Sequence, residues 1–192
     1  MDLTNLSTSQ IVAIAAAVVL LIVGVMAILT MRKNRTTKLK TQFGGVEYDR
    51  AIEKGGNRKL AEAELDARTQ RVEKLNVRPL AAADRARFLE SWLGIQARFV
   101  DGPAGAVAEA DQLLGDVMSR RGYPVSGFEQ RAADISVNYP VVLENYRTAH
   151  EIALRQTRGQ ASTEDLRQAM VHYHKLFDEL VNEPETLAKA AS

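Results

Sequence analysis

The chain contains no cysteine among its 192 residues, which excludes a disulfide framework, a thiol nucleophile and cysteine ligands for a metal. It also lacks a phosphate-binding loop, a dinucleotide-binding glycine pattern and a recognisable set of nucleophile, base and acid. His172 and His174 are two residues apart, so on a helix they point in nearly opposite directions and do not chelate one ion. We therefore predict no catalytic residue, no cofactor and no metal site, and we expect a protein that is not an enzyme.

An excess of positive charge is missing from most of the chain. Residues 41–192 carry 20 basic and 23 acidic side chains, with the two signs mixed. Such a balance lacks the electrostatic footprint of a nucleic-acid-binding domain, so no nucleic-acid partner is expected. This part of the chain is long enough for one domain with its own hydrophobic core.

One long apolar run stands near the N-terminus. The 19 residues from Ile11 to Leu29 carry no charge and would span about 28 Å as a helix, close to the thickness of a bilayer's hydrocarbon core. A signal peptide would have a positive region before a shorter run, and a core helix would have a polar face. Neither feature is present, so the sequence predicts an uncleaved membrane anchor in contact with the lipid bilayer.

Basic residues follow the apolar run, and no lysine or arginine precedes it. Because positively charged flanks stay in the cytoplasm, we expect the N-terminus outside and the rest of the chain inside the cell. The same residues are candidates for contact with anionic lipid, although a topology signal alone is the simpler interpretation. These candidates are Arg32, Lys33, Arg35, Lys38 and Lys40.

Small residues four positions apart, Ser9, Ala13 and Ala17, occur on one face of the predicted anchor. Such spacing allows two membrane helices to approach closely, so a homo-oligomer is a possible assembly.

The fold class predicted from these patterns is all-α, because no segment alternates like a strand. The segment 58–78 has a thin apolar stripe among many charges and covers barely three heptads, which favours a solvated stalk over one strand of a coiled coil. In chain order, the predicted parts are a short extracytoplasmic N-terminus (1–8), a transmembrane helix (9–31), a basic juxtamembrane linker with turns at its glycines (32–57), a charged stalk helix (58–78), a cytoplasmic bundle of four to five helices (79–183) and a flexible tail (184–192).

The bundle is predicted from apolar residues at helical spacing. Phe88, Trp92, Ile95 and Phe99 share one face of a helix. Ser162 precedes Asp165 by three residues, a short form of the capping box that opens the last helix. An unbroken apolar stripe follows it, which we expect to seal the core: Leu166, Met170, Tyr173, Phe177 and Leu180.

Two turns carry the side chains most typical of an interface. "SRRGYP" and "DISVNYP" combine arginine and tyrosine, which are frequent anchors of protein–protein contacts. The candidate surface for a partner or ligand therefore consists of Arg120, Arg121, Tyr123 and Tyr139. An alternative use of the adjacent arginines is an anion-binding loop, although arginines in a helix's last turn also stabilise its dipole.

Three strings, "FGGVEYDRAIEKGGNR", "RPLAAADRARFLESWLGIQARFVDGPAGAVAEADQLLGDVMSRRGYP" and "STEDLRQAMVHYHKLFDELV", resemble an uncharacterised family of bacterial single-pass membrane proteins. The resemblance implies a location in the bacterial inner membrane and no known activity. We therefore expect a membrane-anchored, non-enzymatic module that docks an unknown cytoplasmic protein partner or forms an assembly at the membrane. The alternative is a ligand-sensing or regulatory bundle that uses Arg120 and Arg121.

Overall fold

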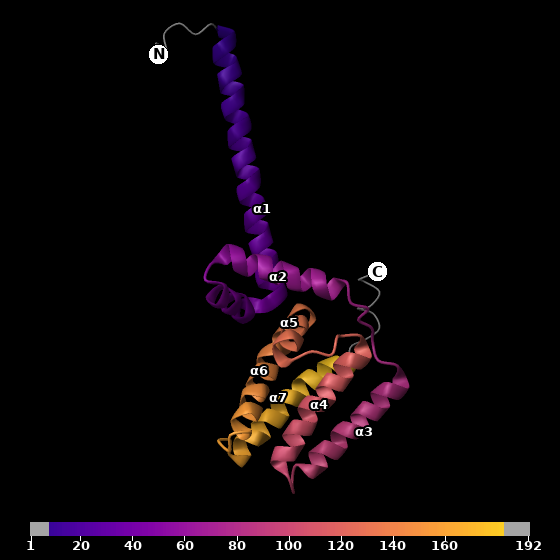
Figure 1. The fold of residues 1–192 in the computed structure, drawn as a ribbon. Helices are drawn as coiled ribbons and strands as arrows, with labels where there is room; N and C mark the ends of the chain where they lie inside the picture. The colour runs from indigo at the N-terminus through magenta and orange to yellow at the C-terminus, as the bar shows by residue number, and fades with distance from the viewer. Residues whose placement is uncertain (1–7, 183–192) are drawn as a thin grey trace.

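The computed structural model describes the backbone of residues 8–182 and the side chains of that range except those of 8–13, 15, 16 and 32. This part of the chain is all-helical and contains no strand, which confirms the predicted class. Figure 1 shows one long helix standing away from a packed body. The helices are α1 (Thr8–Gly55), α2 (Arg58–Glu73), α3 (Ala82–Arg98), α4 (Pro103–Arg121), α5 (Phe128–Asn138), α6 (Pro140–Gln156) and α7 (Thr163–Asn182).

The first half of α1 is the exposed apolar helix. Within the stretch from Ala17 to Gly55 it contains a window long and apolar enough to cross a membrane, and none of that window is buried. Leu20 and Leu21 are 72% and 68% exposed. Their burial therefore requires an apolar environment that the rest of this chain does not supply.

The second half of α1 differs from the sequence prediction for residues 32–57. It is helical on both sides of Gly44, whose φ of 71° and ψ of 159° put a kink in the helix. The turn predicted near "EKGGN" does occur, and the Asn57 side chain caps α2 by accepting a hydrogen bond from the Leu60 amide at 2.9 Å. The segment is thus part of the folded body instead of a linker.

α2 also differs from the solvated stalk that we expected. It folds back against the second half of α1, and a small core joins the two helices. Leu65, which looked like part of a thin stripe, is fully buried there. We call residues 33–73 the anchor hairpin; its core consists of Leu39, Phe43, Tyr48, Ala51, Ala61 and Leu65.

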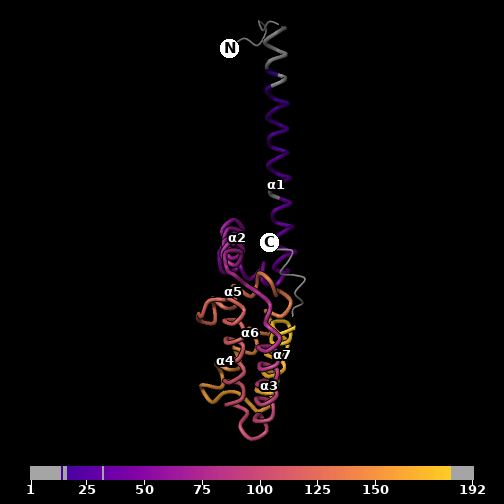
Figure 2. Tube along the Cα trace, turned by 90° about the vertical axis from the view of Figure 1, so that its right-hand side faces the viewer, coloured from indigo at the N-terminus to yellow at the C-terminus, as the bar shows by residue number. Residues whose placement is uncertain are grey.

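Helices α3 to α7 form the bundle, in agreement with the predicted four to five helices. Figure 2 shows these five helices together at the end away from the free part of α1. Trp92 is buried and stacks on Phe177, with ring centroids 4.8 Å apart. All five predicted stripe residues of α7 are buried, which confirms that this face is core.

Candidate functional site

The surface predicted at the two arginine–tyrosine turns is not a surface. Arg121, Tyr123 and Tyr139 are 1%, 2% and 7% exposed. Arg121 donates to the Tyr139 hydroxyl, to the Leu180 carbonyl at 3.0 Å and, through Nε, to the Arg78 carbonyl at 3.3 Å. These bonds tie three parts of the chain together, so the side chain holds the bundle closed.

The physical reason is that the segment after α2 covers this turn. The Arg78 amide donates to the Arg121 carbonyl at 2.9 Å, and Gly122, at φ 103°, lies directly against the Asn76 backbone. Arg120 alone of the four is largely exposed, and its Nε lies 2.5 Å from Asp84. An anion-binding loop formed by Arg120 and Arg121 together does not agree with the burial of Arg121.

The basic residues proposed to contact lipid lie in different environments. Lys33 and Lys38 are exposed. Arg35 is paired with Asp66 of α2, and the Lys40 ammonium lies 5.1 Å from the centroid of the Tyr48 ring. The Arg32 side chain lies outside the described residues.

A buried group of charges joins the anchor hairpin to the bundle. Its centre is Glu47 of α1, which is 3% exposed. Arg68 of α2 donates to its Oε1 at 2.6 Å, and Arg147 of α6 donates to its two oxygens at 3.2 and 3.3 Å. One carboxylate thus accepts bonds from arginines of the hairpin and of the bundle.

Further pairs surround this centre. Arg68 also donates to Glu64 at 2.7 Å, and Arg71 of α2 donates to the fully buried Asp134 of α5 at 2.9 Å. Burial by itself lowers the pKa of Arg68, but its hydrogen bonds to Glu64 and Glu47 outweigh burial and raise that pKa above the usual value. The guanidinium therefore stays charged inside the junction.

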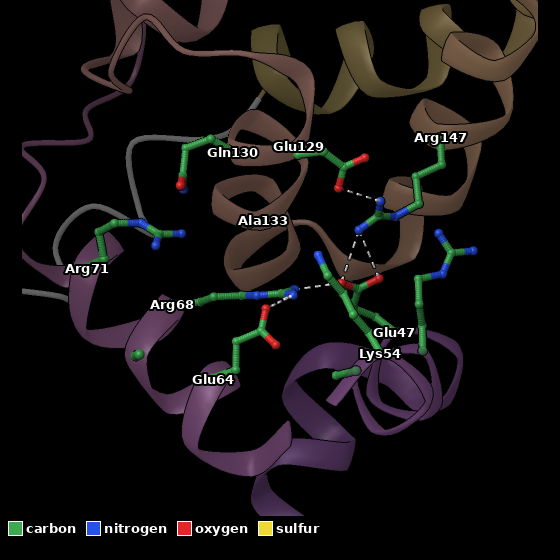
Figure 3. Close-up of a pocket in the computed structure, with 12 residues that line it drawn as sticks. Glu47, Lys54, Glu64, Arg68, Arg71, Glu129, Gln130, Ala133 and Arg147 are labelled. Atoms are coloured by element: carbon green, nitrogen blue, oxygen red, sulfur yellow. Dashed lines mark hydrogen bonds and ion pairs between the residues drawn. The ribbon is translucent and has the colours of Figure 1, made fainter. Parts of the chain in front are cut away.

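Between the two bodies lies a half-open space of about 360 Å³, which we call the junction cavity. Figure 3 shows side chains of the hairpin and of α5 and α6 extending toward it, among them Lys54, Arg71 and Gln130. Its wall carries five basic and three acidic side chains: Arg50, Lys54, Arg68, Arg71 and Arg147 against Glu47, Glu64 and Glu129.

A second group of polar side chains lies inside the bundle. Asp111 of α4 pairs with Arg131 of α5 at 3.1 Å, and the guanidinium lies 5.9 Å from the centroid of the Tyr146 ring. Burial, followed by the negative charge of Asp111, raises the pKa values of Tyr146 and Tyr173 far above the usual value. These hydroxyls therefore stay protonated at any physiological pH.

The outward face of α3 is the exposed surface that sequence reasoning missed. Ala86, Leu89, Leu93 and Ala97 are exposed at spacings of three and four residues, and Leu93 is 66% exposed. We call these four residues the outer stripe. Its sequence signal was present, but the opposite face of the same helix, which contains Trp92, is the stronger apolar pattern and was assigned first.

Groups of three or more potential metal ligands are absent from the described part of the chain. No family model, known protein or solved structure matches this chain.

Proposed function

We propose that this chain is a membrane-anchored, non-enzymatic helical protein that docks a cytoplasmic protein partner, or assembles with itself, at the bacterial inner membrane. The observation that carries the docking role is the outer stripe of α3, an apolar face left in solvent on a helix whose other face is core. Exposed apolar patches on a folded helix are typical of protein interaction sites.

The anchor rests on the apolar first half of α1 and its flank. A helix long and apolar enough to span a bilayer is followed by five basic residues and preceded by none, so the positive-inside rule places the anchor hairpin and the bundle in the cytoplasm. The inner-membrane location rests on the resemblance of the three quoted strings to single-pass bacterial membrane proteins.

The junction supports the same role by fixing the bundle to its anchor. α1 runs from the apolar segment into the hairpin, and Glu47 links that hairpin to α6. A partner helix bound to the outer stripe would therefore be held at a defined distance from the membrane. Such a partner would present its own apolar stripe to Leu89 and Leu93, as helices packed in parallel or antiparallel pairs do.

The test is photo-crosslinking of the full-length protein in native membranes. The photoreactive residue benzoylphenylalanine replaces Leu93 in one variant and Val125 in a matched control, since Val125 is an apolar residue that is 90% exposed but lies in the loop before α5. We expect a discrete adduct from position 93 and none from position 125. An adduct of twice the chain's mass would identify assembly, and any other mass a separate partner.

Leu89 provides the second position on the stripe, one helical turn from Leu93. Adducts absent from both stripe positions, in variants whose circular dichroism matches the parent, would contradict docking through α3. Equal adducts from positions 93 and 125 would show non-specific contact and would also contradict it.

A further inference from the structure

The junction cavity offers hydrogen-bond donors that its own carboxylates do not satisfy. The Nε atoms of Arg68 and Arg147 are buried and have no acceptor within the described part of the protein. Buried donors of a charged group are rarely left without an acceptor in folded proteins. Both oxygens of Glu47, the nearest carboxylate, are already occupied by the terminal nitrogens of these arginines.

The charges around the cavity point the same way. Arg50 and Arg71 have carboxylate partners in Glu144 and Asp134, which do not line the cavity. Lys54 forms no ion pair with any described residue. The cavity therefore contains one unpaired ammonium beside two guanidinium groups that share a single buried carboxylate, and a bound anion would balance this excess.

We infer that the junction cavity binds a small oxyanion of the phosphate type, with Lys54 at its mouth and Arg68 and Arg147 at its base. Guanidinium groups match the tetrahedral oxygens of phosphate with paired donors, and lysine binds phosphate as a point charge. The volume of about 360 Å³ lies at the lower end of the range of about 300–1,000 Å³ for small-ligand sites. It suits a phosphate group with a short organic substituent.

The phosphate comes from a soluble compound and not from a lipid headgroup. Leu29 ends the apolar run and Phe43 precedes the kink, so about 21 Å of helix separates the hydrocarbon from the hairpin's far end, where the cavity lies. The headgroup layer extends only about 5–8 Å beyond the hydrocarbon on each side. This step alone rests on the proposed anchor; the binding of an oxyanion goes beyond docking and does not depend on any partner.

The experiment is isothermal titration of inorganic phosphate into the full-length protein in phosphatidylcholine nanodiscs, with sodium chloride of equal ionic strength as the blank. We expect saturable binding that Lys54→Gln weakens by about tenfold, the equivalent of one charge-assisted hydrogen bond. The matched control is Lys59→Gln, because Lys59 is exposed on α2 and does not line the cavity; it should bind like the parent.

Both test positions are exposed lysines, so neither substitution removes a core contact. Phosphate binding that is absent, or that Lys54→Gln and Lys59→Gln weaken equally, would overturn the site. A second arm uses phosphatidylglycerol nanodiscs in a buffer that screens surface charge. Unchanged phosphate affinity supports a soluble ligand, whereas competition by the lipid would overturn that assignment. Neither arm measures partner docking, so its outcome is separate from that of the crosslinking test.

Discussion

Arg147 of α6 donates hydrogen bonds to both carboxylate oxygens of Glu47 in α1, across 100 positions of the sequence. Glu47 also holds Arg68 of its own hairpin. Because two buried guanidinium groups depend on one carboxylate, its removal leaves both without their shared counter-ion. The contact between the hairpin and the bundle is therefore expected to depend on this residue more than on the pairs at its rim.

Glu47→Ala should destabilise the attachment of the hairpin by about 3–5 kcal/mol, the cost of removing one partner from a buried ion pair. The measurement is native-state hydrogen exchange of the α2 amides in the full-length protein. The control is Glu144→Ala, since Glu144 pairs with Arg50 across the same junction at 2.9 Å but is 48% exposed, and exposed pairs contribute at most about 1 kcal/mol. Equal effects of the two substitutions would contradict the central role of Glu47.

Trp92→Ala should lower the free energy of unfolding of the bundle by about 3–5 kcal/mol, because a large buried aromatic is removed from the core. The indole ring also loses its stacking on Phe177. Urea denaturation followed by circular dichroism measures this difference. Leu93→Ala, one residue away on the exposed face, should change stability by no more than about 0.5 kcal/mol; a comparable loss there would mean that both faces of α3 are buried.

Gly122 and Gly105 predict opposite signs for the same substitution. At Gly122 a Cβ would overlap the Asn76 carbonyl, and the φ of 103° strains any L-residue, so Gly122→Ala should destabilise by more than about 1–2 kcal/mol. Gly105 lies within α4 with no atom near its Cβ position, so Gly105→Ala should stabilise by about 0.5–1 kcal/mol. Melting temperatures of the two variants decide this, and a shift in the same direction for both would refute the prediction.

The local features were predictable from sequence because their causes are local. The Ser162 amide bonds to Asp165 at 2.9 Å and the Asp165 amide to the Ser162 hydroxyl at 3.1 Å, as the capping pattern indicates. Pro140 is the first residue of α6, where its missing N–H costs no hydrogen bond. The apolar spacing of α7 likewise identified its buried face.

The anchor hairpin and the candidate site were not predictable in this way, because they depend on contacts between distant residues. The Tyr48 hydroxyl donates to Glu62 at 2.8 Å, and Phe43 packs in the same small core as Leu65. Each segment alone carries too few apolar residues to reveal a core. Glycines near Phe43 suggested a turn, and Gly44 does leave the helical conformation, but the chain resumes a helix after it.

Acidification should weaken the fold through two histidines. Burial lowers the pKa of His150, which stacks on Phe128, and burial together with Lys175 lowers that of His172. Below about pH 6.5, the unfolded chain therefore binds protons that the native chain does not, and stability falls as the pH falls until the native pKa values are reached.

The urea midpoint should accordingly be lower at pH 5.5 than at pH 7.5 and equal at pH 7.5 and 8.5. The double variant His150→Gln/His172→Gln should show a smaller drop between pH 7.5 and 5.5. An undiminished drop in that variant would place the acid sensitivity on other groups. Carboxylates with lowered pKa values, such as Glu62 and Asp165, lose their contribution at lower pH, below about 4.5.

Cysteine labelling tests the membrane topology most directly, because the natural chain contains no cysteine and each introduced thiol is therefore the only one. Thr4→Cys marks the N-terminus, and Val125→Cys marks the bundle at a position that is 90% exposed. In intact spheroplasts of cells that make the full-length protein, a membrane-impermeant maleimide should label Thr4→Cys, and it should label Val125→Cys only after lysis. Labelling of Val125→Cys in intact spheroplasts, or recovery of the protein in the soluble fraction, would contradict a membrane anchor with a cytoplasmic bundle.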